Sequence, residues 1–129
     1  LSSPHAMSTL DLSGLGVSAV DVDTIQQNVI NQVKRTKQLE LNQQLADLER
    51  SIETLKREIK SIGRILHKSK QRKIQLTPSE LNAHLTKQKK HAAELQQQLT
   101  SKHEVVSKLA FIQQTIDEDA NNHHSAAQQ

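Results

Sequence analysis

The chain has 129 residues, with 17 Lys and Arg against 14 Asp and Glu, no Cys, no Trp, no Tyr, one Phe and three Gly. A β-sandwich, a barrel or a Rossmann domain needs glycine turns and bulky interior layers, so this composition argues against all three. The absence of Cys excludes a disulfide framework and a thiolate metal site. Leu, Ile, Val and Ala supply most of the apolar residues, which favours long helices with narrow seams in one domain at most.

Three segments precede the strongest pattern. Residues 1–6 are interpreted as a cloning remnant in front of a start methionine. Residues 7–20 contain two glycines among apolar residues, which predicts an irregular segment that docks on something. Residues 21–38 carry apolar residues at helical spacing, which predicts an amphipathic helix. Its N-cap is either Asp21 or Asp23, and the pattern does not decide between them.

Eight apolar residues follow an unbroken heptad pattern. They are separated alternately by four and three residues, an average of 3.5, which is typical of a left-handed coiled coil. The pattern predicts a coiled-coil helix over residues 39–70. The predicted seam residues are Leu41, Leu45, Leu48, Ile52, Leu55, Ile59, Ile62 and Leu66.

A second coiled-coil helix is predicted over residues 77–118, after a basic loop at residues 71–76. Thr77 is the expected cap, Pro78 fits the first helical position, and Glu80 can return a hydrogen bond to the cap. The heptad spacing continues from there, with polar residues at three positions. Its apolar seam positions are Leu81, Leu85, Leu95, Leu99, Val106 and Leu109, with Ala92 and Ile116 on the same pattern.

Two seams of similar length, joined by a short connection, predict an all-α fold in which an elongated antiparallel helical hairpin carries an extra N-terminal amphipathic helix. A parallel intermolecular zipper through residues 41–66 remains the alternative, and with it a homodimer. The pattern leaves open whether the helices over 21–38 and 39–70 run on as one. The polar tail, residues 119–129, is predicted to be disordered.

Positive charge is concentrated in the middle of the chain. Residues 56–90 hold eleven Lys and Arg and two Glu, so the hairpin turn is expected to be basic. Such a surface suits a phosphate backbone or an acidic protein face, although solubility alone also explains it. The absence of aromatics for base stacking makes single-strand recognition unlikely. The candidate contact residues are Arg64, Lys68, Lys70, Arg72, Lys73, Lys87, Lys89 and Lys90.

No motif for chemistry is present. The sequence lacks a glycine-rich phosphate loop, an HExxH pair and a nucleophile motif, so we expect no enzyme activity and assign no catalytic residue. His123 and His124 cannot share one helical face, and no metal site is predicted. No stretch is long and apolar enough to predict a membrane span.

Residues 15–33 read LGVSAVDVDTIQQNVINQV. The Leu-Gly-Val start, the aspartate-flanked turn and the amphipathic stretch ending in Gln-Val resemble the N-terminal regulatory motif of Cockayne syndrome group B proteins. These are SWI/SNF-type DNA-dependent ATPases of transcription-coupled repair. The heptads that follow are similar to the coiled coil of that family, so the resemblance covers about residues 15–110.

The resemblance implies a non-catalytic fragment of a nuclear chromatin-remodelling ATPase. In that family an N-terminal leucine latch restrains the ATPase core, which holds the ATP and Mg; this fragment would need no cofactor of its own. The expected partner is the parent's own ATPase core, with DNA or RNA polymerase II as further candidates. The latch falls on Leu15, Val17, Ile25, Val29, Ile30 and Val33.

Overall fold

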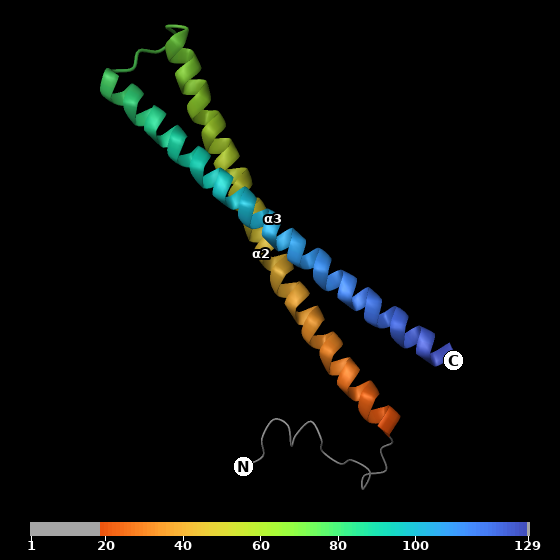
Figure 1. Ribbon diagram of the computed structural model, residues 1–129. Helices are drawn as coiled ribbons and strands as arrows, with labels where there is room; N and C mark the ends of the chain where they lie inside the picture. Colours follow the sequence, from red (N-terminus) through yellow and green to blue (C-terminus); the bar gives the residue numbers. More distant parts are fainter. Residues whose placement is uncertain (1–18, 129) are drawn as a thin grey trace, which may run out of the picture. The chain divides into compact units, whose positions relative to one another are not determined.

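A computed structural model of the protein describes residues 19–128. Within that range the chain forms two helices, α2 (Ala19–Lys70) and α3 (Pro78–Gln128), and no strand (Figure 1). The predicted all-α fold is therefore confirmed. The chain divides into two compact units, Leu1–Lys37 and Gln38–Gln129. The hairpin lies in the second unit. Of the first unit, the structure describes the beginning of α2.

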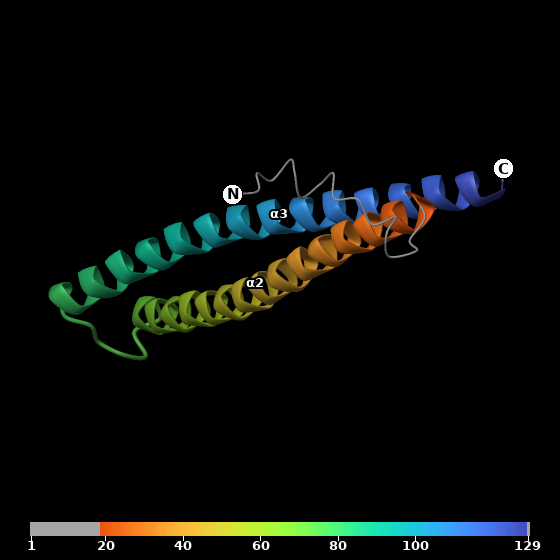
Figure 2. The same cartoon turned by 90° about the horizontal axis from the view of Figure 1, so that it is seen from below.

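Contacts between the two helices of the second unit establish that they are antiparallel. Gln38 Nε2 donates a hydrogen bond of 2.7 Å to Gln113 Oε1. Lys102 Nζ lies 3.9 Å from Glu49 Oε1. Nearer the turn, a Cβ added at Gly63 would lie 3.7 Å from Gln88 Nε2. The α3 partner falls in number as the α2 partner rises, so the predicted antiparallel hairpin is confirmed (Figure 2).

The core of the hairpin is the predicted apolar seam of α2. Leu41, Ile52, Leu55 and Ile62 are between 2 and 6% exposed, and the other four predicted seam residues of α2 are half-buried. Val105 of α3, 7% exposed, completes the buried apolar set among the described residues. Since α3 covers this seam within one chain, the seam is not free to form the alternative parallel zipper.

The predicted helices over 21–38 and 39–70 are one continuous element, which settles the question that the pattern left open. No Gly or Pro occurs between Ala19 and Ser61, so nothing in the sequence interrupts the helix there. The expected N-caps are wrong, because α2 already begins at Ala19. Asp21 lies in the first turn instead, where its negative charge favours the positive end of the helix dipole.

The end of α2 is closed by backbone hydrogen bonds that follow the Schellman pattern. The Lys73 N–H donates to the Lys68 carbonyl at 2.9 Å, and the Arg72 N–H donates to the Ser69 carbonyl at 3.0 Å. Arg72 has a φ of 61°, the left-handed conformation that this motif requires and that glycine usually supplies. The basic residues of the last turn, His67, Lys68 and Lys70, face the negative end of the helix dipole.

The predicted capping box at the start of α3 is confirmed. Glu80 N–H donates to Thr77 Oγ1 at 3.1 Å, and Thr77 N–H donates to Glu80 Oε1 at 3.1 Å. Pro78 occupies the first helical position, as expected. The hydrogen bond from the Thr77 N–H, together with the Thr77 side chain, stabilises the Glu80 carboxylate and lowers its pKa below the ordinary value of 4.5.

The end of α3 differs from the predicted one. The helix continues to Gln128 instead of ending at residue 118, so residues 119–128 of the predicted disordered tail are helical. Hydrogen bonds between side chains one turn apart support the helix up to residue 118. Gln113 donates to Asp117 at 2.9 Å, and Gln114 donates to Glu118 at 3.0 Å. No Gly or Pro follows Pro78 to stop the helix.

The capping box predicts a pH-dependent contribution to stability. Because the folded state lowers the pKa of Glu80, its contribution is present above the unfolded pKa and is lost as the pH falls through the folded pKa. We expect Glu80→Ala to lower the urea midpoint slightly at pH 7, and the gap from the parent chain to close as the pH falls below 4.5 and through the folded pKa. Circular dichroism at several pH values measures this. Gln97→Ala, at an exposed interior position of α3, should show no such closing gap, because Gln has no ionisable group.

Candidate functional site

The face that α3 turns toward α2 is not the predicted one. Four residues of the predicted seam are exposed, between 38 and 48%: Leu81, Leu85, Leu99 and Val106. Leu95, Leu109 and Ile116 are half-buried, as a seam position requires. In every second row of the seam, the α3 residue that faces α2 lies one position before the residue that the heptad pattern predicts. These residues, seven apart, form a column along α3. Its buried or half-buried members are His84, His91, Gln98, Val105 and Ile112.

One polar contact with α2 comes from the rotated column, since His91 Nε2 lies 3.1 Å from Glu58 Oε2. Lys102, which reaches Glu49, stands on the predicted heptad pattern and does not require the rotation. Val105 and Ile112, seven residues apart, were the signal in the sequence that could have identified this column. The other members of the column are His and Gln, so it does not stand out as an apolar heptad pattern. The seam is thus apolar on the α2 side and largely polar on the α3 side.

Buried polar atoms mark the α3 side of the seam. The His91 side chain is 14% exposed, and the geometry of its approach to Glu58 makes no hydrogen bond. Glu94 lies 4.0 Å from its other ring nitrogen. Gln98 Oε1 is also buried without a hydrogen-bond partner. Since an unsatisfied buried polar atom costs stability, these two side chains weaken the seam.

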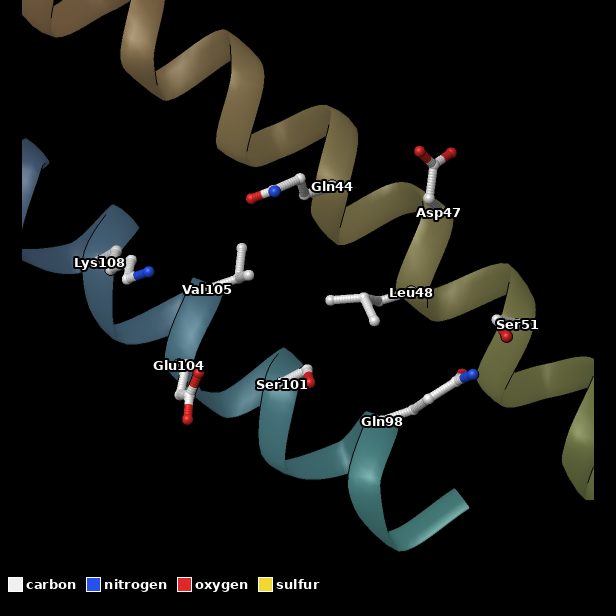
Figure 3. A pocket seen from close by; sticks show the side chains of 9 residues that line it. All are labelled: Gln44, Asp47, Leu48, Ser51, Gln98, Ser101, Glu104, Val105 and Lys108. Carbon is white, nitrogen blue, oxygen red and sulfur yellow. The ribbon is translucent and has the colours of Figure 1, made fainter. Parts of the chain in front are cut away.

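A shallow polar groove follows one edge of the seam (Figure 3). Leu48 and Val105 extend into the space between the helices, and polar side chains surround them. The groove is open and brings together no set of groups that suits catalysis. The polar lining residues are Gln44, Asp47, Ser51, Gln98, Ser101, Glu104 and Lys108.

The opposite side of α3 carries an apolar surface, which we call the outer stripe: Leu85, Ala92, Leu99 and Val106. Ser101 and Lys108 of the groove each come two positions after an outer-stripe residue, so they lie about 200° around the helix from it. All four outer-stripe side chains are exposed. The two edges of the seam therefore differ in chemistry, one polar and one apolar.

The predicted basic contact residues lie on both helices and on the turn that joins them. Arg64, Lys68 and Lys70 belong to α2, Arg72 and Lys73 to the turn, and the other three to α3. All eight are exposed. Within the part of the chain that the structure describes, none of them forms an ion pair. The structure therefore brings together a solvent-exposed cationic region, and the pairing from 63 to 88 places both helices in it.

Four of the six predicted latch residues lie within the described part of the chain. Leu15 and Val17 lie outside the described residues. The other four lie near the beginning of α2 and are between 46 and 64% exposed: Ile25, Val29, Ile30 and Val33. They follow one another at separations of four, one and three residues, which places them along one broad side of the helix.

Two other kinds of site are absent from the described residues. No group of three or more His, Cys, Asp or Glu among residues 19–128 is arranged to hold a metal ion. Neither described helix has a stretch apolar enough to cross a membrane.

No known protein family, curated protein or solved structure matches the chain. The likeness to the Cockayne syndrome group B motif thus stays a prediction from residues 15–33.

Replacing His91 with an apolar residue should stabilise the hairpin. The ring nitrogens of His91 are buried without hydrogen bonds, and Leu at this position would extend the apolar seam. We expect His91→Leu to raise the free energy of unfolding by about 1–2 kcal/mol, measured by urea denaturation. His103→Leu, at an exposed position of the same helix, should change it by less than about 0.5 kcal/mol. A destabilised His91→Leu chain would contradict this account of the seam.

Proposed function

We propose that this chain is a non-catalytic regulatory module of a nuclear DNA-dependent ATPase in transcription-coupled repair. In this proposal its N-terminal apolar latch restrains the ATPase and remodelling core, and the hairpin is an interaction element. The observation that carries the proposal is the exposure of Ile25, Val29, Ile30 and Val33 on a regular helix. The resemblance of residues 15–33 to the regulatory motif supports the identity of the target.

The exposed apolar residues are a physical argument for an external docking site. Each of Ile25, Val29 and Ile30 keeps about half of its surface in contact with water. Burial of such a side chain contributes about 1.5–3 kcal/mol before ordering costs. A docking preference of about 2.7 kcal/mol would hold roughly 99% of molecules in the restrained state. Two or three of these side chains are enough to supply it.

The first test measures DNA-stimulated ATP hydrolysis by the full-length protein. Ile25→Ala, Val29→Ala and Ile30→Ala together should raise the rate, because release of a latch that holds roughly 99% of molecules allows an increase of up to about 100-fold. The matched control changes three exposed polar residues of the same helix segment, Gln26, Asn28 and Gln32, to Ala and should leave the rate unchanged. An unchanged rate in the apolar variant, with helicity retained, would remove the latch from the proposal.

A second candidate function is contact with duplex DNA through the basic region at the turn. Eleven basic residues against two acidic ones over residues 56–90, with the eight contact residues exposed, favour it. Phosphate contacts of this kind release counterions, so the affinity should fall steeply as salt rises. An acidic face on RNA polymerase II would satisfy the same charges.

Neutralisation of the turn tests the DNA contact. Lys68, Lys70, Arg72 and Lys73 changed to Gln should weaken binding to a duplex and lower the slope of log affinity against log salt by up to about 4. Fluorescence anisotropy over a salt series measures both quantities. Residues 38–55 and 91–129 hold more acidic than basic side chains, and changing their three basic residues, Arg50, Lys102 and Lys108, to Gln should affect the slope less. Equal effects of the two variants would show that net charge alone, and not the turn, attracts DNA.

A further inference from the structure

The packing of α3 against α2 does not bury the outer stripe. Leu85, Leu99 and Val106 are between 38 and 48% exposed, while the α2 seam is already covered by the α3 column one position earlier, which includes His91, Gln98 and Val105. Together with Ala92 they repeat at intervals of seven residues, so they form one straight line along a helix that is slightly supercoiled. A line of this kind is the contact surface that one helix offers to another.

We propose that the outer stripe binds the outer stripe of a second copy of this chain, with the two α3 helices antiparallel. The distribution of charge within the second unit determines the orientation. Residues 56–90, the half next to the turn, hold eleven basic and two acidic side chains. Residues 38–55 and 91–129 hold nine acidic and three basic ones. Antiparallel pairing sets the basic half of each copy against the acidic half of the other, whereas parallel pairing opposes two basic halves.

The order of residues in the stripe agrees with a two-fold axis. An axis between Leu95 and Gln96 places Leu85 opposite Val106 of the second copy, and Ala92 opposite its Leu99. The small residue therefore meets a large one at each inner layer, and the interface is self-complementary, as a two-fold dimer requires.

The size of the contact predicts a reversible dimer. The stripe from residue 85 to residue 106 spans about 31 Å of helix, and a helix with its side chains is about 10 Å wide. Each copy thus contributes on the order of 300 Å², well below the roughly 800 Å² of a standard interface. Association should therefore depend on concentration and weaken as salt screens the opposed charges. This inference does not depend on the regulatory role proposed above.

The first experiment measures mass by sedimentation equilibrium from micromolar to several hundred micromolar chain. The proposal expects the mass to rise from 14.5 kDa toward twice that value, and the dissociation constant to increase with salt. Leu85→Glu with Val106→Glu should keep the chain monomeric. Phe111→Glu is the matched control, because Phe111 is 65% exposed and lies about 140° around α3 from Val106. A monomer at every concentration, or a dimer that only Phe111→Glu disrupts, would overturn the proposal.

Cysteine pairing tests the orientation on the folded chain. The sequence has no Cys, so Leu85→Cys and Val106→Cys can be introduced singly. Under mild oxidation, a mixture of the two variants should give the 85–106 crosslink, while each variant alone should give little dimer. In an antiparallel pair, two copies of residue 85 lie about 31 Å apart, much too far for a disulfide. Efficient crosslinking of Leu85→Cys to itself would show a parallel dimer and overturn the proposed arrangement.

Discussion

The apolar stripe of α2 is the constraint on which the rest of the second unit depends. Eight aliphatic side chains between Leu41 and Leu66 cannot remain in water, and a single helix has no means of covering them. The chain covers them by reversing direction after Lys70 and returning as α3. The Schellman closure at Arg72 and the capping box at Thr77 make the reversal short, because each satisfies backbone groups that a helix end leaves without partners.

The two helices contribute unequally to their contact. α2 brings an aliphatic seam, while α3 brings His, Gln and Lys as well as Val and Leu, and keeps part of its own apolar surface outside. The contact of His91 with Glu58 accompanies the rotation of α3 away from its predicted face. The rotation gives up some burial within the chain and leaves the outer stripe exposed. The hairpin is accordingly a folded unit that keeps an apolar line on its surface.

The antiparallel hairpin, the buried face of α2 and the start of α3 were predictable, whereas the face that α3 turns toward α2 was not. The unbroken heptads of α2 identified its buried face, and the Thr77–Glu80 pair identified the start of α3, because both depend on residues within a turn or two. The rotation of α3 depends on partners such as Glu58 that lie more than thirty residues away in sequence. Helix ends without a strong stop signal were also misplaced, since Ala19 and Gln128 bound the helices where no Gly or Pro intervenes. The latch at residues 15–33 stays a prediction.

The uneven seam also distributes apolar contact unequally along the hairpin. Opposite Ile59, Ile62 and Leu66, α3 presents the polar residues His91, Gln88 and His84, so fewer apolar side chains meet across the seam in the half nearest the turn. The same half carries the concentrated positive charge, whose self-repulsion opposes the contact between the helices. Charge repulsion is therefore opposed by less apolar contact at the turn end than at the acidic end.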